Sequence, residues 1–280
     1  MKRIFATLWL ILSFLYPANA GAETVLEKIY RTGLLEVGIR EDAIPFGYRD
    51  SNHNLEGLCL DFVNILREEL KRELNLNIIS VKIYKSTLFN RFDLVENGTI
   101  DLECGPNTIR ENLDRRVTFS RPFFVTGTQF LIRRENRANL NLNTLENIRI
   151  GVLRDTTTAS LLREKYPNAT LQEFQGATGR LRGVQALKRR NIDAFASDGI
   201  LLLGEAIVLG LSLEEEYAIV PENPLDCEYY GLILPSDNPR WKELVNSVII
   251  AAQNREVLRQ WFGEIAPYFI ETLNYCRNKS

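Results

Sequence analysis

The chain has 280 residues, a formal net charge of −2 at pH 7 and a sequence pI near 5.7. Its 45% hydrophobic and 25% charged residues are ordinary values for a globular protein, and no domain-wide positive field is present to collect nucleic acid. A single histidine, His53, excludes a multi-histidine metal site and leaves a histidine-based hydrolase only one turn residue to use.

The first 20 residues predict a secretory signal peptide. Lys2 and Arg3 precede an apolar run from Ile4 to Tyr16, and Ala18-Asn19-Ala20 supplies a small-residue cleavage site. The apolar run is shorter than the roughly 20 residues of a spanning helix, which disfavours a membrane anchor. We therefore expect a soluble mature chain exported to the periplasm.

The next part of the chain alternates short apolar runs with segments whose apolar residues recur at helical spacing. A polar, Asn-rich connector at Glu135–Asn143 ends this first set. The predicted strands are Leu34–Ile39, Asn77–Lys85 and Ile100–Cys104, and the predicted helices are Leu58–Leu74 and Thr87–Gly98.

A second set follows the same pattern. Its predicted strands are Ile148–Leu153, Leu171–Phe174 and Ile192–Asp198, and its predicted helices are Thr156–Tyr166, Gly179–Arg190 and Gly199–Gly210. A strand at Glu228–Pro235 returns toward the first set, and a long terminal helix covers Arg240–Phe262 with Leu258 and Trp261 on its apolar face. Strands alternating with helices predict an α/β protein with parallel sheets.

Two α/β lobes joined by two crossing segments would enclose a cleft and provide a hinge. The segments FFVTGTQFLI and CEYYGLIL are the expected crossings. We therefore expect residues 23–124 and 226–280 to form lobe one and residues 125–225 to form lobe two, after the signal peptide at 1–20.

The order and spacing of several segments resemble a periplasmic amino-acid-binding protein of an ABC importer, of solute-binding protein family 3. The matching segments are LEVGIREDAIPFGY, LEGLCLDFVNIL, NGTIDLECGPNTI, VTFSRPFFVTGTQFLI, NIRIGVLRDTTT, ALKRRNIDAFASDGILL, EYYGLILP and VLRQWFGEI. They look most similar to glutamate/aspartate-binding proteins. The resemblance implies the type II two-lobed fold, a monomer, a free amino acid as ligand, permease subunits as partners, and no cofactor, metal or catalytic residue.

The resemblance also implies the residues that bind the ligand's amino-acid core. Asp198 would pair the ammonium group, although a strand-end aspartate is also a helix N-cap. Thr156 and Thr157 begin a helix whose N-terminus favours the α-carboxylate, although they also suit capping alone. Pro106 would offer a carbonyl to the ammonium group, and Thr108 would offer donors to the carboxylate.

Lobe one would recognise the ligand's side chain. Arg40 and Arg91 match arginines of the acidic-ligand binders, and a guanidinium fork fits a carboxylate bidentately. The alternative for Arg40 is a surface residue that pairs Glu41 or Asp42, and for Arg91 a solvated helix face. Phe46 and Tyr48 are candidates for walling the ligand's aliphatic part, although plain packing also explains them.

The chain departs from the family pattern at two positions. The arginine for the α-carboxylate is replaced by Leu113. Arg110 lies three residues earlier and would reach the vacated place from the same side of a helix, if 108–114 is helical. A histidine of the acidic-ligand binders falls on Arg180, whose permanent charge suits an anion.

Four cysteines in an exported chain allow three disulfide pairings, and spacing alone does not choose between them. A resemblance to the ligand cores of glutamate receptors implies a bond between Cys227 and Cys276. The apolar neighbours of Cys59 and Cys104 predict buried thiols.

Two other functions fit the same fold. A periplasmic dehydratase acting on arogenate or prephenate would need a general acid in the cleft, and Asp198 is the only distinctive one. A soluble sensor would pass the ligand state to a partner protein, and nothing in the sequence separates it from a transport protein.

Overall fold

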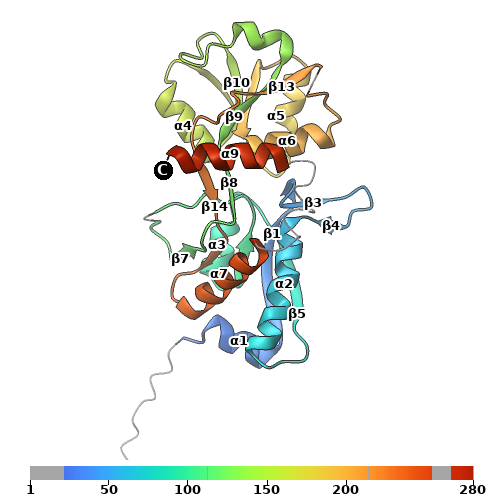
Figure 1. Cartoon of the computed structure of the whole chain (residues 1–280), viewed down its shortest axis with the longest axis vertical. Coiled ribbons are helices and arrows are strands. Elements are labelled where there is room, and N and C mark those ends of the chain that lie inside the picture. The colour runs from blue at the N-terminus through green and yellow to red at the C-terminus, as the bar shows by residue number, and fades with distance from the viewer. Residues whose placement is uncertain (1–21, 112, 214, 254–265, 280) are drawn as a thin grey trace, which may run out of the picture.

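The computed structural model describes residues 22–111, 113–213, 215–253 and 266–279, and two five-stranded sheets organise it into two lobes (Figure 1). Helices cover each sheet, so the expected two-lobed α/β fold is confirmed. The predicted signal peptide at 1–20 and the end of the predicted terminal helix, with Leu258 and Trp261, lie outside the described residues.

The first sheet has the strand order β5-β1-β6-β15-β7. β1 runs parallel to β5 and β6, whereas β15 runs antiparallel to β6 and β7. The lobe contains strands β1 (Leu34–Arg40), β5 (Ser80–Ser86), β6 (Leu102–Cys104), β7 (Val117–Phe119) and β15 (Ile233–Pro235), with helices α1 (Val25–Thr32), α2 (Leu58–Glu73), α3 (Arg91–Glu96) and α7 (Pro239–Gln253). A small separate sheet of β2 (Asp42–Ala43), β3 (Gly47–Arg49) and β4 (Leu55–Glu56) projects from its side (Figure 1).

The second sheet has the order β11-β10-β12-β9-β13, with β10 parallel to β11 and β12 and with β9 antiparallel to β12 and β13. Every residue of the neighbouring strands β12 and β9 is buried, because helices cover both faces of an α/β sheet. The strands are β9 (Thr128–Arg133), β10 (Arg149–Leu153), β11 (Thr170–Phe174), β12 (Ala194–Asp198) and β13 (Tyr217–Val220), and the helices are α4 (Thr157–Lys165), α5 (Gly179–Lys188), α6 (Gly199–Val208) and the 3₁₀ helix η1 (Arg134–Asn139).

Two antiparallel strands carry the chain between the lobes. β8 (Phe124–Thr126) leaves the first lobe and β14 (Glu228–Tyr230) returns to it, and the two pair side by side (Figure 1). The predicted single strand at 228–235 is therefore two strands. It breaks at Gly231, where a Cβ atom would lie 2.9 Å from the side chain of Ile109.

Several elements have no counterpart in the sequence prediction, among them α1, the β2–β3–β4 sheet, β7, β13 and α9 (Ala266–Lys279). α1 is nevertheless well encoded locally. Thr24 and Glu27 form a reciprocal capping box at its start, and Gly33 ends it in the left-handed conformation with φ of 64°.

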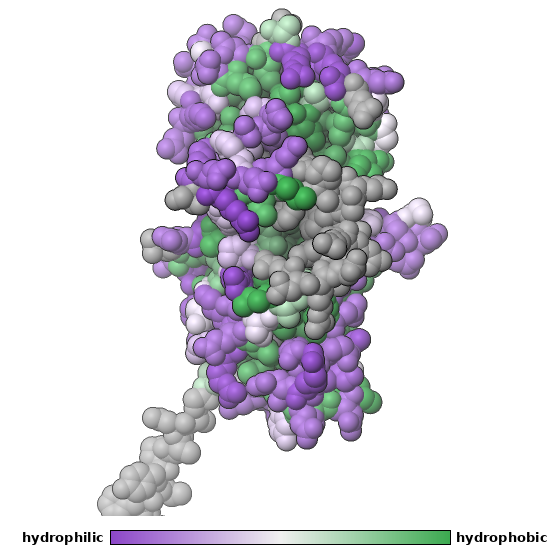
Figure 2. All heavy atoms as spheres, viewed as in Figure 1, coloured by the Kyte–Doolittle hydropathy of each residue, from purple (hydrophilic) through white to green (hydrophobic). Residues whose placement is uncertain are grey.

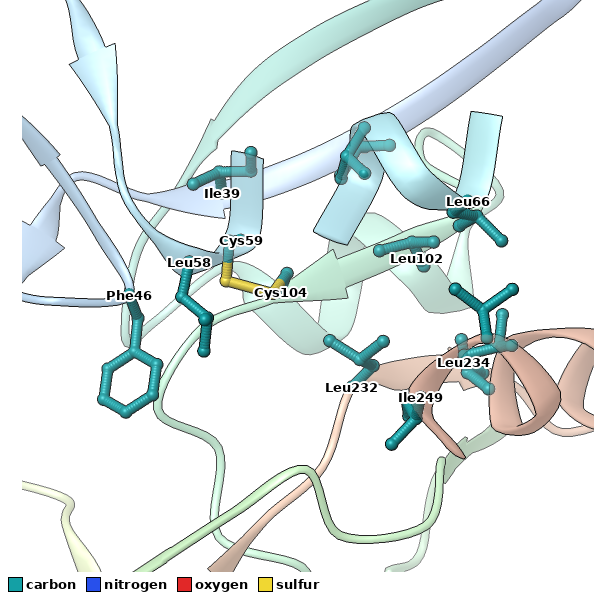
Figure 3. Close-up of a cluster of buried hydrophobic side chains, with 14 of the residues drawn as sticks. Ile39, Phe46, Leu58, Cys59, Leu66, Leu102, Cys104, Leu232, Leu234 and Ile249 are labelled. Carbon is teal, nitrogen blue, oxygen red and sulfur yellow. A yellow bond between two sulfur atoms is a disulfide. The ribbon is translucent and has the colours of Figure 1, made fainter. Parts of the chain in front are cut away.

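Each lobe has its own apolar interior. The core of the first lobe gathers side chains from β1, α2, β6 and α7 around Cys59 and Cys104 (Figure 3). It also includes Ile200 and Leu201 from the first turn of α6 in the second lobe, so α6 packs across the boundary between the lobes.

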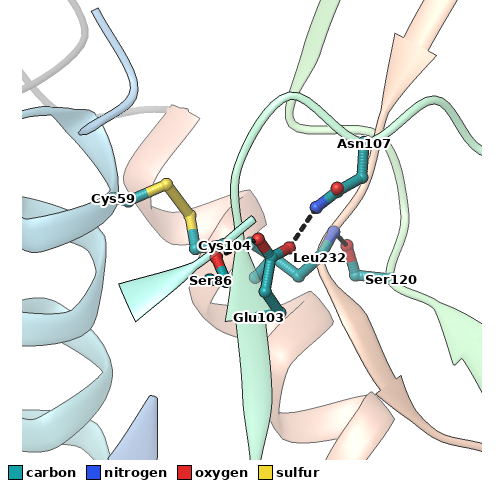
Figure 4. The surroundings of a disulfide bond; sticks show 7 residues. All are labelled: Cys59, Ser86, Glu103, Cys104, Asn107, Ser120 and Leu232. Atoms are coloured by element: carbon teal, nitrogen blue, oxygen red, sulfur yellow. Dashed lines mark hydrogen bonds between the residues drawn. A yellow bond between two sulfur atoms is a disulfide. The ribbon is translucent and has the colours of Figure 1, made fainter. Parts of the chain in front are cut away.

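Both cysteine pairs form disulfides. Cys227 is bonded to Cys276, which ties α9 to the chain just before β14, with Cα atoms 5.8 Å apart. The prediction of buried thiols at Cys59 and Cys104 is wrong, because these residues are bonded to each other (Figure 4). Apolar neighbours correctly predicted their burial, but they gave no sign that the first turn of α2 lies against β6, with Cα atoms 5.7 Å apart.

The visible face of the molecule is mostly hydrophilic, with apolar patches between the polar side chains (Figure 2). Among the residues that the structure describes, no helix is both long and apolar enough to cross a membrane.

Candidate functional site

A cavity that opens to solvent lies between the lobes. The cavity is lined by Arg40, Leu88, Arg91, Pro106, Thr108, Arg110, Leu153, Asp155, Thr156, Thr157, Thr158, Arg180, Ser197, Asp198 and Leu201. The structure thus brings nine of the eleven predicted ligand residues to one place.

Asp198 ends β12 inside the cavity wall and is 8% exposed. It stands at the N-cap position of α6, but its side chain makes no capping bond there. Instead it accepts hydrogen bonds from the hydroxyls of Tyr230 and Thr158, the latter at 3.4 Å. Burial raises the pKa of Asp198 to about 6, because the charged form loses its hydration. The charge of Arg180 acts in the opposite direction, but it forms no ion pair with this carboxylate among the described residues.

The N-terminus of α4 forms the neighbouring wall. Thr156 is the N-cap, and its hydroxyl accepts from the N–H of Ala159 and donates to the carbonyl of Leu153. Its side chain is therefore committed to capping. The first N–H groups of a helix have no intrahelical acceptor, so they and the helix dipole favour an anion at this wall.

Glu228, which sequence reasoning missed, links both lobes from the hinge strand β14. Thr108 of the first lobe and Thr157 of the second interact with its carboxyl group and lower its pKa, while its buried Oε2 has no hydrogen-bond partner among the described residues. Burial and the nearby charge of Asp198 raise its pKa to about 8. The side chain does not line the cavity, and one glutamate in an extended segment gave no signal of this place.

Arg40 is buried, and its guanidinium fork is already filled. Its Nε and Nη2 donate to the two carboxylate oxygens of Asp42 at 2.7 and 2.9 Å. The alternative that Arg40 pairs with Asp42 is thus confirmed. The expected surface position is wrong, because the Arg40 side chain is only 2% exposed.

Arg91 and Arg180 are buried on opposite sides of the cavity, in α3 and α5. Each donates from Nη1 to a main-chain carbonyl at 2.5 Å, Arg91 to Leu88 and Arg180 to Asp42. The alternative of a solvated helix face is therefore wrong for Arg91. Burial and the neighbouring charge of Arg40 lower the pKa of Arg91 to about 10.

The described residues of 108–114 form no helix, so the condition under which Arg110 would reach the place of Leu113 is not met. Thr108 forms a β-bridge with Tyr230, and the N–H of Ile109 donates to the carbonyl of Tyr229, so the chain is extended here. Arg110 is exposed, lines the cavity and places its guanidinium 5.6 Å from the centre of the Phe92 ring. The backbone of this segment pairs with the hinge strand β14 instead.

Leu113 is partly buried and packs against the apolar cluster of Ile100, Val117 and Phe119. It is not among the residues that line the cavity. Apolar packing thus occupies the position at which the family pattern has an arginine.

Phe46 and Tyr48 do not line the cavity, which corrects the expectation that they wall the ligand. The fully buried Phe46 ring packs edge-on against the rings of Phe124 and Tyr230. The Tyr48 hydroxyl lies in the small sheet, 3.4 Å from Glu56. Plain packing, the alternative for these aromatics, describes Phe46.

The residues 35–264 match the family model described as bacterial extracellular solute-binding proteins, family 3. The glutamate/aspartate import solute-binding protein of Escherichia coli (strain K12) is 30% identical over 253 residues, which cover 88% of this chain and 81% of that protein. An L-glutamate/L-aspartate-binding protein of Pseudomonas aeruginosa is 27% identical over 86% of this chain and 81% of the relative.

Solved structures share the fold at lower identity. An ancestral amino-acid-binding protein, described as a precursor of cyclohexadienyl dehydratase, has a TM-score of 0.72 at 20% identity and covers 87% of this chain and 99% of its own. An amino acid ABC transporter substrate-binding protein from Streptococcus pneumoniae, bound to L-arginine, has a TM-score of 0.70 at 20% identity, with coverages of 87% and 98%.

Proposed function

Because the chain belongs to family 3 of the bacterial extracellular solute-binding proteins, we propose that it captures a free acidic or polar amino acid in the periplasm and delivers it to an ABC permease. We also propose the lobe division 23–124 with 226–280, and 125–225, so that closure of the lobes encloses the ligand. A ligand that touches both lobes favours the closed form, which is the form a permease can distinguish.

The charge arrangement of the cavity carries the proposal. Asp198 supplies one buried carboxylate, and burial raises its pKa to about 6. Arg91, Arg110 and Arg180 line the same cavity and form no ion pair within the described part of the chain. The lining has one other acidic residue, the exposed Asp155, so cationic groups outnumber anionic ones. This excess of positive charge suits a ligand with one ammonium group and more than one anionic group, which is the charge pattern of an acidic amino acid.

A thermal-shift screen against the twenty L-amino acids tests this function. A ligand that binds only the native state at 100 times its Kd stabilises the protein by about 2.7 kcal/mol. We expect L-glutamate or L-aspartate to raise the melting temperature, and Asp198→Asn to lose that response. A rise with arginine alone would contradict the acidic assignment, and no rise with any amino acid would contradict the binding function.

Delivery to a permease needs a separate test. Deleting the gene should lower uptake of the labelled amino acid that the screen identifies, and restoring the gene should recover it. Unchanged uptake, together with ligand binding, would favour the sensor alternative. The dehydratase alternative predicts loss of water from arogenate or prephenate in the presence of the purified protein.

A further inference from the structure

The fork of Arg40 is closed to a ligand by the geometry around it. Asp42 accepts from Nε and Nη2, the edge of a guanidinium that matches a carboxylate. The stem of Arg40 is held as well, because a Cβ atom at Gly105 would lie only 2.5 Å from its Cγ. A second buried carboxylate, Glu103, interacts electrostatically with the same arginine. Arg40 is therefore neutralised within its own lobe.

Arg91 and Arg180, unlike Arg40, have no ion-pair partner among the described residues. Both are buried, at 5% exposure each, and the Nε of each has no hydrogen-bond partner among the described residues. The hydrogen bonds that their Nη1 atoms donate go to main-chain carbonyls, which carry no full charge. Carboxylates act on both arginines at longer range, Glu103 and Asp42 on Arg91 and Asp198 and Asp42 on Arg180, but none of them forms an ion pair with either among the described residues. Two buried guanidinium groups of this kind, one from each lobe, leave donors free for an anion in the cavity between them.

Asp42 contacts both a paired and an unpaired arginine. Its carboxylate holds Arg40, while its main-chain carbonyl accepts from Nη1 of Arg180 across the boundary between the lobes. The same residue thus neutralises one arginine and positions another. Its neighbour Glu41 pairs Arg49 and Lys85 instead and takes no part in the Arg40 fork.

We infer that Asp42 is a specificity-determining residue: it withdraws Arg40 from the ligand, so that Arg91 and Arg180 receive the ligand's side-chain anion from both lobes at once. This inference rests on the proposed amino-acid-binding function. It assigns one side-chain anion subsite, at the Arg91–Arg180 pair, and a second, latent subsite at Arg40.

The Asp42→Asn variant tests the inference, with Glu41→Gln as the matched control. Calorimetric titration gives the Kd of L-glutamate and of L-glutamine, two ligands that differ in one charge. Freeing the Arg40 fork should raise the preference for glutamate over glutamine by at least about tenfold in Asp42→Asn, because a bidentate charge-assisted pair becomes available. Glu41→Gln should leave that preference unchanged. A purely structural role for Asp42 would weaken both ligands alike, and an unchanged preference in Asp42→Asn would overturn the inference.

The Arg180→Met variant keeps the inference testable if Asp42→Asn fails to fold, because the Arg180 guanidinium is held by a main-chain carbonyl and not by an ion pair in the described residues. It should reduce the preference for glutamate over glutamine by at least about tenfold, whereas an equal loss for both ligands would overturn the assignment of Arg180. If the protein binds glutamate and the variants keep the wild-type preference for glutamate over glutamine, the proposed function holds and the inference about Asp42 is wrong. If no amino acid binds the wild-type protein, the function itself fails.

Discussion

Replacing Asp198 with asparagine removes a carboxylate that the folded protein buries without an ion-pair partner among the described residues. Its pKa rises from 3.8 to about 6 on folding, and at about 1.4 kcal/mol per pH unit this difference corresponds to about 3 kcal/mol. Because the folded-state pKa is raised, the stabilising contribution is present below pH 3.8 and is lost as the pH rises through about 6. The amide oxygen of the Asp198→Asn variant can still accept the Tyr230 hydroxyl, so the variant should be more stable than the wild type by up to about 3 kcal/mol at pH 7.

Urea unfolding of the ligand-free protein at several pH values between 4 and 7.5 measures this difference. The stability gain should be near zero at pH 4 and should grow to its full value above about pH 6. The same variant should lose amino-acid binding, since its amide cannot neutralise an ammonium group. If the stability gain of Asp198→Asn over the wild type were no larger at pH 7 than at pH 4, the reasoning that Asp198 is a buried charge would be refuted.

The cleft and the core lead to three more expected outcomes. Gly204→Ala should weaken ligand binding at least tenfold, because its Cβ would lie 2.5 Å from the main-chain carbonyl of Ile44 in the other lobe and would keep the lobes from approaching as closely as they do here; calorimetric titration measures the loss. Replacing Cys59 and Cys104 with alanine should lower the free energy of unfolding by about 4 kcal/mol, since the bond spans 45 residues, and urea unfolding measures it. Affinity for the amino acid should fall about tenfold per pH unit below about 6 as Asp198 is protonated, and a flat titration between pH 5 and 6 would contradict this.

Local patterns predicted most of the fold. The helical spacing of α2 and the continuous apolar runs of β10 and β12 each specified their elements, because these segments bury one stripe or both faces. Segments that depend on distant partners were missed. β13 is defined by its pairing with β9, and the break between β14 and β15 falls at Gly231, where the side chain of Ile109 packs closely. Neither feature has a sequence period of its own.

The sequence predicted which residues line the candidate site better than it predicted how they pair with one another. Resemblance placed Asp198 and the α4 threonines at the cleft, and the structure brings them together there. It gave no account of which arginine is already paired. Asp42 follows Arg40 by two residues, and only the turn after β1 brings its carboxylate into the Arg40 fork. Glu228 meets Thr108 across more than 100 residues of chain, a contact that no local pattern encodes.

A crystal structure of the wild-type protein with its amino acid tests the central claim most directly. The account predicts the ammonium group within hydrogen-bond distance of Asp198, an anionic group on Arg91 and Arg180, and Arg40 still bound to Asp42. An amino acid bound outside the cleft between the lobes, or a ligand ammonium group that does not contact Asp198, would contradict it.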